Sequence, residues 1–105
     1  MPEKRRFPRK RRRLTVEFEW EKSHCTGFTY DISPSGIFVR ATRFPTPGAR
    51  ITATLVLPDE TQLQVRGTVV RTFRVPSSMT RLIPSGFSIQ LTDRPEAYLQ
   101  FLAAL

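Results

Sequence analysis

Apolar and polar residues alternate along Leu14-Thr15-Val16-Glu17-Phe18-Glu19-Trp20. Successive side chains of a β-strand point to opposite faces, so a period of two predicts a strand with one buried and one solvent-facing side. The glutamates fall on the solvent side, and the apolar side is formed by Leu14, Val16, Phe18 and Trp20. The rest of the chain repeats this pattern.

Further strand patterns follow, separated by residues that favour turns. They cover residues 25–32, 37–39, 50–57, 63–70 with an extension toward 75, and 86–91. We expect a connection at 22–24, a hairpin turn at 58–61 and a bulge or bend at Gly67. Short strands at regular spacing indicate an all-β fold, either a small antiparallel barrel or a sandwich.

A helix is expected after the last strand. Thr92 or Asp93 is a suitable N-cap, and Pro95 is tolerated in a first helical turn. Apolar residues then fall at helical spacing, namely Tyr98, Leu99, Phe101, Leu102 and Leu105. One face of this helix should therefore dock on the sheet or plug one end of a barrel.

The positive charge of the chain is concentrated before the first strand. Residues 1–13 hold eight of the seventeen Lys and Arg with a single acid, so they carry seven of the eight net positive charges. A run of like charges repels itself and buries little apolar area, so alone it is expected to be disordered. We therefore expect a flexible basic arm at 1–13 that binds an anion, and one folded domain at 14–105.

Composition narrows the cellular setting. The apolar stretches are far shorter than the roughly 20 residues that cross a bilayer, so no membrane span is expected. Cys25 is the only cysteine, which rules out an internal disulfide and is compatible with a reducing compartment. We expect a cytoplasmic protein.

A short turn follows the second predicted strand, with the sequence Asp31-Ile32-Ser33-Pro34-Ser35-Gly36. The Asp31 carboxylate accepts hydrogen bonds, and carboxylates are suited to the N1–H and N2–H donors of guanine. Ser33 adds a hydroxyl, and Gly36 adds a backbone without a side chain. The alternative is that this is only a turn, because Asp, Ser, Pro and Gly are ordinary turn residues.

Together, the arm and this turn resemble the PilZ domain, a bacterial receptor family for cyclic di-GMP. The family is marked by RxxxR in an N-terminal arm and by [D/N]xSxxG one strand pair later. Here Arg5-Arg6-Phe7-Pro8-Arg9 matches the first motif and Asp31 to Gly36 the second. Residues 9–13 also fit RxxxR, but the context of Pro8 favours the register of Arg5 and Arg9. The strands and the closing helix extend the resemblance over nearly the whole chain.

The resemblance implies a six-stranded antiparallel β-barrel with the arm folded over one face. Arg5 and Arg9 would hold phosphates and guanine edges, Asp31 a guanine, and Ser33 a phosphate or ribose, while Gly36 would let the backbone approach the ligand. In the family, the residue before RxxxR, here Lys4, influences whether one ligand or a stacked pair is bound. Ligand binding would order the arm and present it, with part of the 76–84 loop, to a downstream protein partner.

Two other binding functions remain open. The arm could neutralise nucleic-acid phosphates without sequence preference, and small β-barrels commonly bind oligonucleotides. Against this, the aromatics Phe18, Trp20, Phe28 and Tyr30 fall at strand spacing that is more typical of packing than of base stacking. The chain could also be a PilZ-like adaptor that has lost its ligand, although all five motif positions are retained.

An enzyme is not expected, and neither are a cofactor or a metal. His24 and Cys25 are the only residues of their types, and as neighbours on a strand they should point to opposite faces. Such a pair cannot form a nucleophile and base dyad, and a soft metal site would need further His or Cys ligands.

Overall fold

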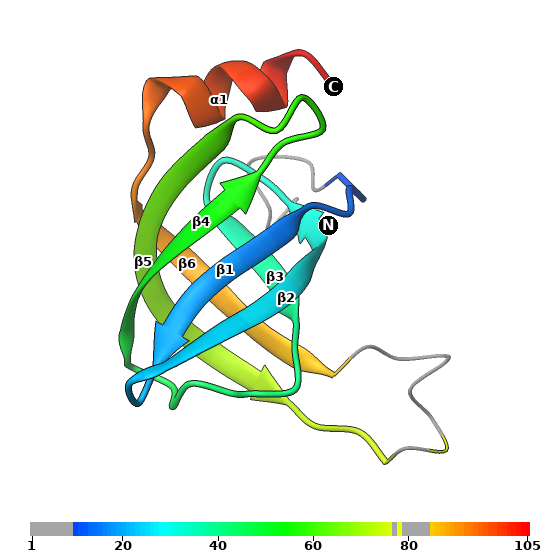
Figure 1. Ribbon diagram of the computed structural model, residues 1–105, viewed down its shortest axis with the longest axis vertical. Coiled ribbons are helices and arrows are strands. Elements are labelled where there is room, and N and C mark those ends of the chain that lie inside the picture. Colours follow the sequence, from blue (N-terminus) through cyan, green and yellow to red (C-terminus); the bar gives the residue numbers. More distant parts are fainter. Residues whose placement is uncertain (1–9, 77, 79–84) are drawn as a thin grey trace, which may run out of the picture.

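The computed structural model describes residues 10–76, 78 and 85–105, and within them it shows six strands and one helix (Figure 1). The elements are β1 (Thr15–Trp20), β2 (Ser23–Ile32), β3 (Gly36–Arg40), β4 (Arg50–Val56), β5 (Gln62–Phe73), β6 (Gly86–Asp93) and α1 (Glu96–Ala103). The sheet order is β1-β2-β3-β6-β5-β4, all antiparallel, and β4 pairs back onto β1. The expected six-stranded barrel with a C-terminal helix is confirmed.

Closure follows from the way the apolar faces of β1 and β4 meet. Val16 lies opposite Leu55 and Phe18 opposite Ala53, so both strands turn the same face inward. Within the barrel, Phe18 packs edge-on against Phe87 with ring centroids 5.3 Å apart. Because every strand has two neighbours, the described barrel leaves no sheet edge open to pairing with another chain.

The first hairpin differs from expectation. Ser23 and His24 belong to β2 rather than to a connection, and Trp20 pairs directly with Ser23. The turn is therefore only Glu21 and Lys22, with φ angles of 53° and 65°. Two-residue hairpin loops need such positive φ values because their twist matches the twist of the strands. The sequence does not reveal this, since neither residue is Gly or Asn.

The longest strand, β5, bends at Gly67 as expected. The β5–β6 register shifts beside Gly67, where Thr92 is the extra residue on β6, and again between Val69 and Arg71, where Val70 is the extra residue on β5. Gly67 is buried, and a Cβ added there would collide with the carbonyl oxygen of Gln90 and lie 2.6 Å from Cγ2 of Ile89. The missing side chain lets β5 and β6 approach closely where the barrel curves.

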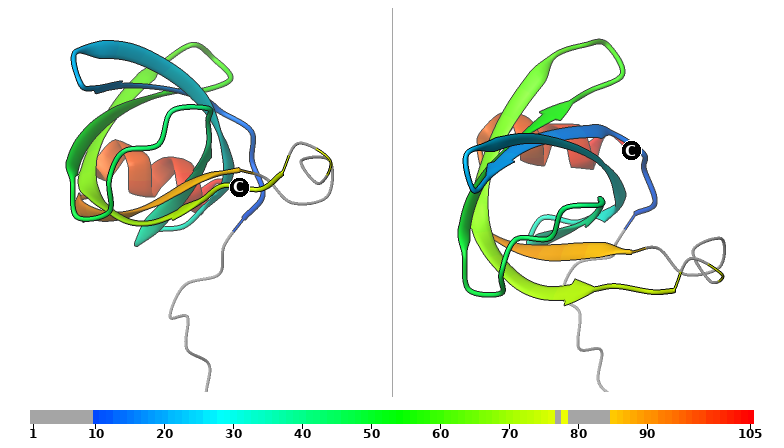
Figure 2. Two further views of the ribbon diagram at one scale, coloured as in Figure 1. Left: turned by 90° about the horizontal axis from the view of Figure 1, so that it is seen from below. Right: turned by 60° about the horizontal axis from the view of Figure 1, so that its bottom comes forward.

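Helix α1 lies across one end of the barrel, as the views in Figure 2 show. Tyr98 and Leu102 are its buried residues. The N-cap expected at Thr92 or Asp93 is wrong, because β6 continues through both and Asp93 pairs with Arg66. The helix begins at Glu96, and Pro95 occupies the cap position without a side-chain cap.

Some expectations fall outside the described residues. These are the arm up to Arg9 and, in the connection between β5 and β6, residues 77 and 79–84. In the described part of the chain, no helix is long and apolar enough to span a membrane.

The Gly67→Ala variant tests the close approach of β5 and β6. The added methyl group must displace the backbone at Gln90, so the free energy of unfolding should fall by about 1–3 kcal/mol. Urea unfolding monitored by circular dichroism measures the change. Val70→Ala on the same strand is the control, because Val70 is 51% exposed and should shift stability by less than about 0.5 kcal/mol. Equal stability of the two variants would show that the barrel does not need a glycine at this bend.

Candidate functional site

The turn between β2 and β3 is closed by hydrogen bonds between Ser33 and Gly36. The Ser33 amide donates to the Gly36 carbonyl at 2.9 Å, and the Gly36 amide donates to Ser33 Oγ at 3.2 Å. The Ser33 hydroxyl can also donate a hydrogen bond to the Gly36 carbonyl oxygen, which is 3.2 Å from Oγ. Ser33 is only 1% exposed, so its buried hydroxyl stabilises the turn.

The helix supports this turn from the other side. The hydroxyl of Tyr98 donates a hydrogen bond to the Ser33 carbonyl at 2.7 Å, and Tyr98 is completely buried. A buried tyrosine needs a partner for its hydroxyl, and here that partner is the backbone of the turn. The position of α1 and the shape of the turn are therefore coupled.

Asp31 sits just before the turn at an irregular point of β2. The β2–β3 register shifts between Thr29 and Asp31, and Asp31 lies opposite Phe38. Tyr30 and Asp31 are both half-buried, whereas Ile32 faces the core. Bulges redirect side chains and often occur beside functional sites. This bulge breaks the simple alternation of β2 at the residue for which ligand contact is expected.

The end of the arm is attached to β2 beside this turn. Lys10 and Ile32 exchange two backbone hydrogen bonds, both of 2.9 Å. The Leu14 amide donates to Thr29 Oγ1 at 2.8 Å, and that hydroxyl in turn donates to the Arg12 carbonyl. Thr29 is 2% exposed, so a buried side chain holds the backbone of residues 12–14. Residues 10–14 therefore run beside β2, on the side where β1 pairs, as far as the turn.

The attached residues place arginines over outward-facing aromatic rings. The guanidinium of Arg11 lies 4.4 Å from the ring centroid of Tyr30, and that of Arg13 lies 4.2 Å from the centroid of Phe28. Sequence reasoning assigned packing roles to these aromatics but missed their arginine partners. Arg11 and Arg13 share the spacing of two that separates Phe28 from Tyr30, but only the path of the arm along β2 brings the two pairs together.

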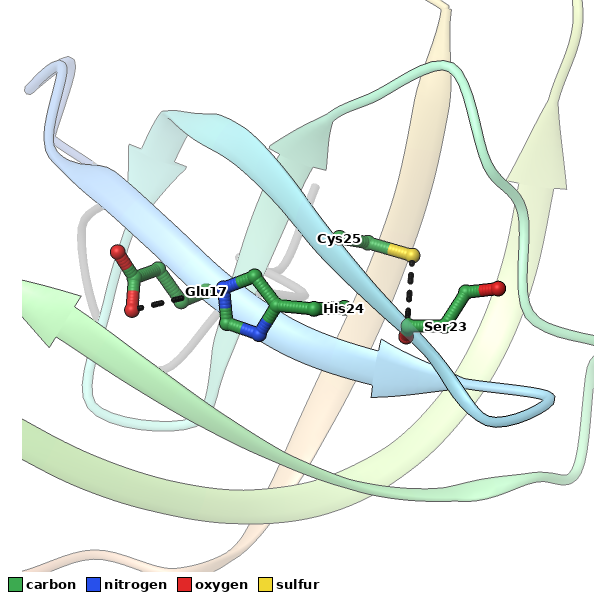
Figure 3. Close-up of polar contacts among 4 residues, drawn as sticks. All are labelled: Glu17, Ser23, His24 and Cys25. Carbon is green, nitrogen blue, oxygen red and sulfur yellow. Dashed lines mark hydrogen bonds and ion pairs between the residues drawn. The ribbon is translucent and has the colours of Figure 1, made fainter.

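His24 and Cys25 point to opposite faces of β2, as expected (Figure 3). Cys25 is buried with its Sγ 3.6 Å from the Ser23 carbonyl, whereas His24 is exposed with Nε2 3.8 Å from Glu17 Oε1. The two side chains therefore cannot act together. Among the described residues, no group of three or more His, Cys, Asp or Glu side chains could hold a metal ion.

Comparison with known proteins identifies the family. The profile described as the PilZ domain matches residues 3–105. This chain belongs to the PilZ domain family. The match includes the barrel, the helix, the turn and nearly all of the arm.

Solved PilZ structures share this fold. The Bacillus subtilis inhibitor of motility MotI/DgrA is similar over 98% of this chain, with a TM-score of 0.76 and 22% identity. That match covers 49% of MotI/DgrA, so this PilZ domain spans about half of that protein. The PilZ domain of YcgR from Escherichia coli, solved with c-di-GMP, matches 96% of this chain and 87% of its own, with a TM-score of 0.73 and 12% identity. Among curated proteins, none matches the sequence.

The expected site residues divide into two groups. The PilZ fold places Asp31, Ser33 and Gly36 within one strand end and turn, next to the attachment of Lys10. The arm residues Lys4, Arg5 and Arg9 lie outside the described residues. Tyr98 was assigned only to the buried helix face, and the structure adds its support of the turn.

The Tyr98→Phe variant tests this support. It removes one hydrogen-bond donor from a buried carbonyl without changing the ring, so the free energy of unfolding should fall by about 1–3 kcal/mol. Chemical denaturation measures the loss. Tyr30→Phe removes a hydroxyl from a half-buried ring and should change stability by less than about 0.5 kcal/mol. A Tyr98→Phe protein as stable as the parent would contradict a structural role for this bond.

Proposed function

We propose that this PilZ domain binds cyclic di-GMP between its arm, 1–13, and its barrel, 14–105. In this proposal the ligand contacts come from Lys4, Arg5 and Arg9 in the arm and from Asp31, Ser33 and Gly36 at the turn. Membership of the family and the presence of both motifs support this function. The YcgR PilZ domain, solved with c-di-GMP, shows that this fold accommodates such a ligand.

The observation that carries the proposal is the backbone pairing of Lys10 with Ile32. Ile32 is the second residue of the Asp31–Gly36 motif, and Lys10 directly follows Arg9 in the chain. Because consecutive Cα atoms are about 3.8 Å apart, the pairing tethers the end of RxxxR to the turn. This pairing supports the proposal that two short motifs, separated by more than twenty residues in sequence, contribute to one site.

The proposed chemistry matches the two parts of a guanine dinucleotide. The Asp31 carboxylate accepts from N1–H and N2–H of guanine, and arginine forks bind phosphate or guanine O6 and N7. Ser33 Oγ faces the Gly36 backbone, so it must turn its proton outward before it donates to a phosphate or ribose oxygen. Lys4 adds a point charge that favours a second ligand by countering the added phosphates.

The function proposed is signalling by binding rather than catalysis. Ligand contact with the arm changes the surface that this domain offers, and a protein partner reads the change. The chemistry needs no cofactor besides the ligand.

Calorimetric titration with cyclic di-GMP tests the site. Arg9→Ala and Asp31→Ala each remove a charge-assisted contact, which should cost about 1.5–3 kcal/mol, or roughly 10- to 100-fold in affinity. Arg12→Ala is the matched control, because it removes an equal charge from an exposed arm residue outside both motifs and should change affinity less than about threefold. The number of cyclic di-GMP molecules bound per parent protein shows whether Lys4 accompanies one ligand or a stacked pair.

Equal losses in all three variants would indicate diffuse charge instead of a defined site. GTP and a random oligonucleotide are the control ligands. A salt-sensitive titration with the oligonucleotide and none with cyclic di-GMP would establish the nucleic-acid alternative.

Amide hydrogen exchange tests the response of the arm. Saturation with cyclic di-GMP should slow exchange at residues 4–9, because contact with ligand orders that backbone. Amide exchange in β4 serves as the reference and should not change, because β4 is a neighbour of neither β2 nor β3 in the barrel. Unchanged exchange throughout the arm at saturating ligand would contradict signalling by the arm.

A further inference from the structure

A basic surface lies on the outside of the barrel beside the proposed ligand turn. It surrounds a hollow of about 600 Å³ between the attached arm residues and the outer faces of β2 and β3. We call it the arginine hollow and define it by Arg11, Arg13, Phe28, Tyr30, Arg40 and Thr42. None of the residues lining this hollow is an acid.

The arginines of the hollow are oriented by aromatic stacking. Arg11 covers Tyr30 and Arg13 covers Phe28, with guanidinium carbons 4.4 and 4.2 Å from the ring centroids. A guanidinium at this distance over a ring is held by the cation–π attraction, and its N–H donors form a fork suited to a carboxylate. Within the described part of the chain, carboxylates form ion pairs with His24 and Arg43 and with neither stacked arginine.

The backbone that carries these arginines is also fixed. Lys10 is paired with Ile32, and Thr29 holds the backbone at Arg12 and Leu14. Arg11 and Arg13 are therefore anchored on both sides while their side chains remain exposed. A surface that is ordered before binding avoids much of the entropy cost of ordering flexible side chains on contact.

The stacking also decides between two classes of partner. Single-stranded nucleic acid binds by stacking bases on open aromatic faces. Here the arginines of the protein itself lie over Tyr30 and Phe28, and the Tyr30 and Phe38 rings pack in a T-shaped arrangement with centroids 5.9 Å apart. The hollow therefore presents guanidinium donors to solvent beside Phe28, which is 37% exposed. Arginine and aromatic residues are typical of the energetic centres of protein interfaces.

We propose that the arginine hollow is the docking surface for an acidic segment of the partner protein. Carboxylates of that segment bind the edges of Arg11 and Arg13, and an apolar side chain packs on Phe28. This inference rests on the proposed function, in which a protein partner reads the domain, and it names the chemistry of that partner. Tyr30 directly precedes Asp31, so the docking surface adjoins the proposed ligand site.

A charge-preserving double variant, R11K/R13K, tests the proposal. The probe is a fluorescein-labelled twelve-residue peptide with four Glu-Asp-Leu repeats, titrated by fluorescence anisotropy at physiological salt. Lysine keeps the charge but loses the planar fork, so affinity should fall about tenfold. The matched control is R50K/R66K, two exposed arginines on β4 and β5 away from the hollow, which should bind like the parent. Thermal melts verify that both variants fold.

Equal peptide affinity in the parent and R11K/R13K would overturn the proposal, because net charge alone would then explain binding. A tenfold loss for a twelve-residue oligothymidylate, with unchanged binding of the acidic peptide, would also overturn it and assign the hollow to nucleic acid.

The same variants are titrated with cyclic di-GMP so that the two proposals fail separately. Loss of peptide binding with retained cyclic di-GMP binding in R11K/R13K supports the docking surface. A parent protein that binds the peptide through Arg11 and Arg13 but does not bind cyclic di-GMP also supports the surface, while it ends the proposed receptor function.

Discussion

Backbone pairing between β1 and β4 is the constraint on which the rest of this structure depends. It converts a row of alternating strands into a closed barrel, with Val16 facing Leu55 and Phe18 facing Ala53 across the seam. The β1–β2 hairpin places residues 10–14, which directly precede β1, along the same side of β2. Closure also forms the barrel end that α1 covers. The closed barrel therefore carries both the turn and the attachment of residues 10–14.

The turn and the arm end are held by different kinds of contact. The turn is stabilised by the hydroxyl of Ser33 and by the hydrogen bond from Tyr98, so its shape depends on buried side chains. The end of the arm depends on backbone hydrogen bonds and on the hydroxyl of Thr29. Within the described residues, the turn and the end of the arm are therefore held by separate sets of contacts.

Much of this fold was predictable because its signals are local. The alternation along residues 14–20, the bend at Gly67 and the opposite directions of His24 and Cys25 each depend on neighbouring residues. The start of α1 was not predictable from Thr92 and Asp93, because β6 continues through both residues and Asp93 pairs with Arg66. Motif spacing predicted Asp31, Ser33 and Gly36 as site residues, and these three lie at one strand end and turn. The bond from Tyr98 spans 65 residues, and the stacking of Arg11 depends on the path of the arm, so no local pattern specified either contact.

The pairing of Lys10 with Ile32 uses only main-chain atoms. The attachment is therefore indifferent to the side chain at position 10, provided that the residue is not proline, which has no amide hydrogen to donate. Substitutions there are free to alter the local charge while the tether persists. The arm and the barrel can thus diverge at different rates during evolution, and a new binding preference can arise at the arm without rebuilding the fold that carries it.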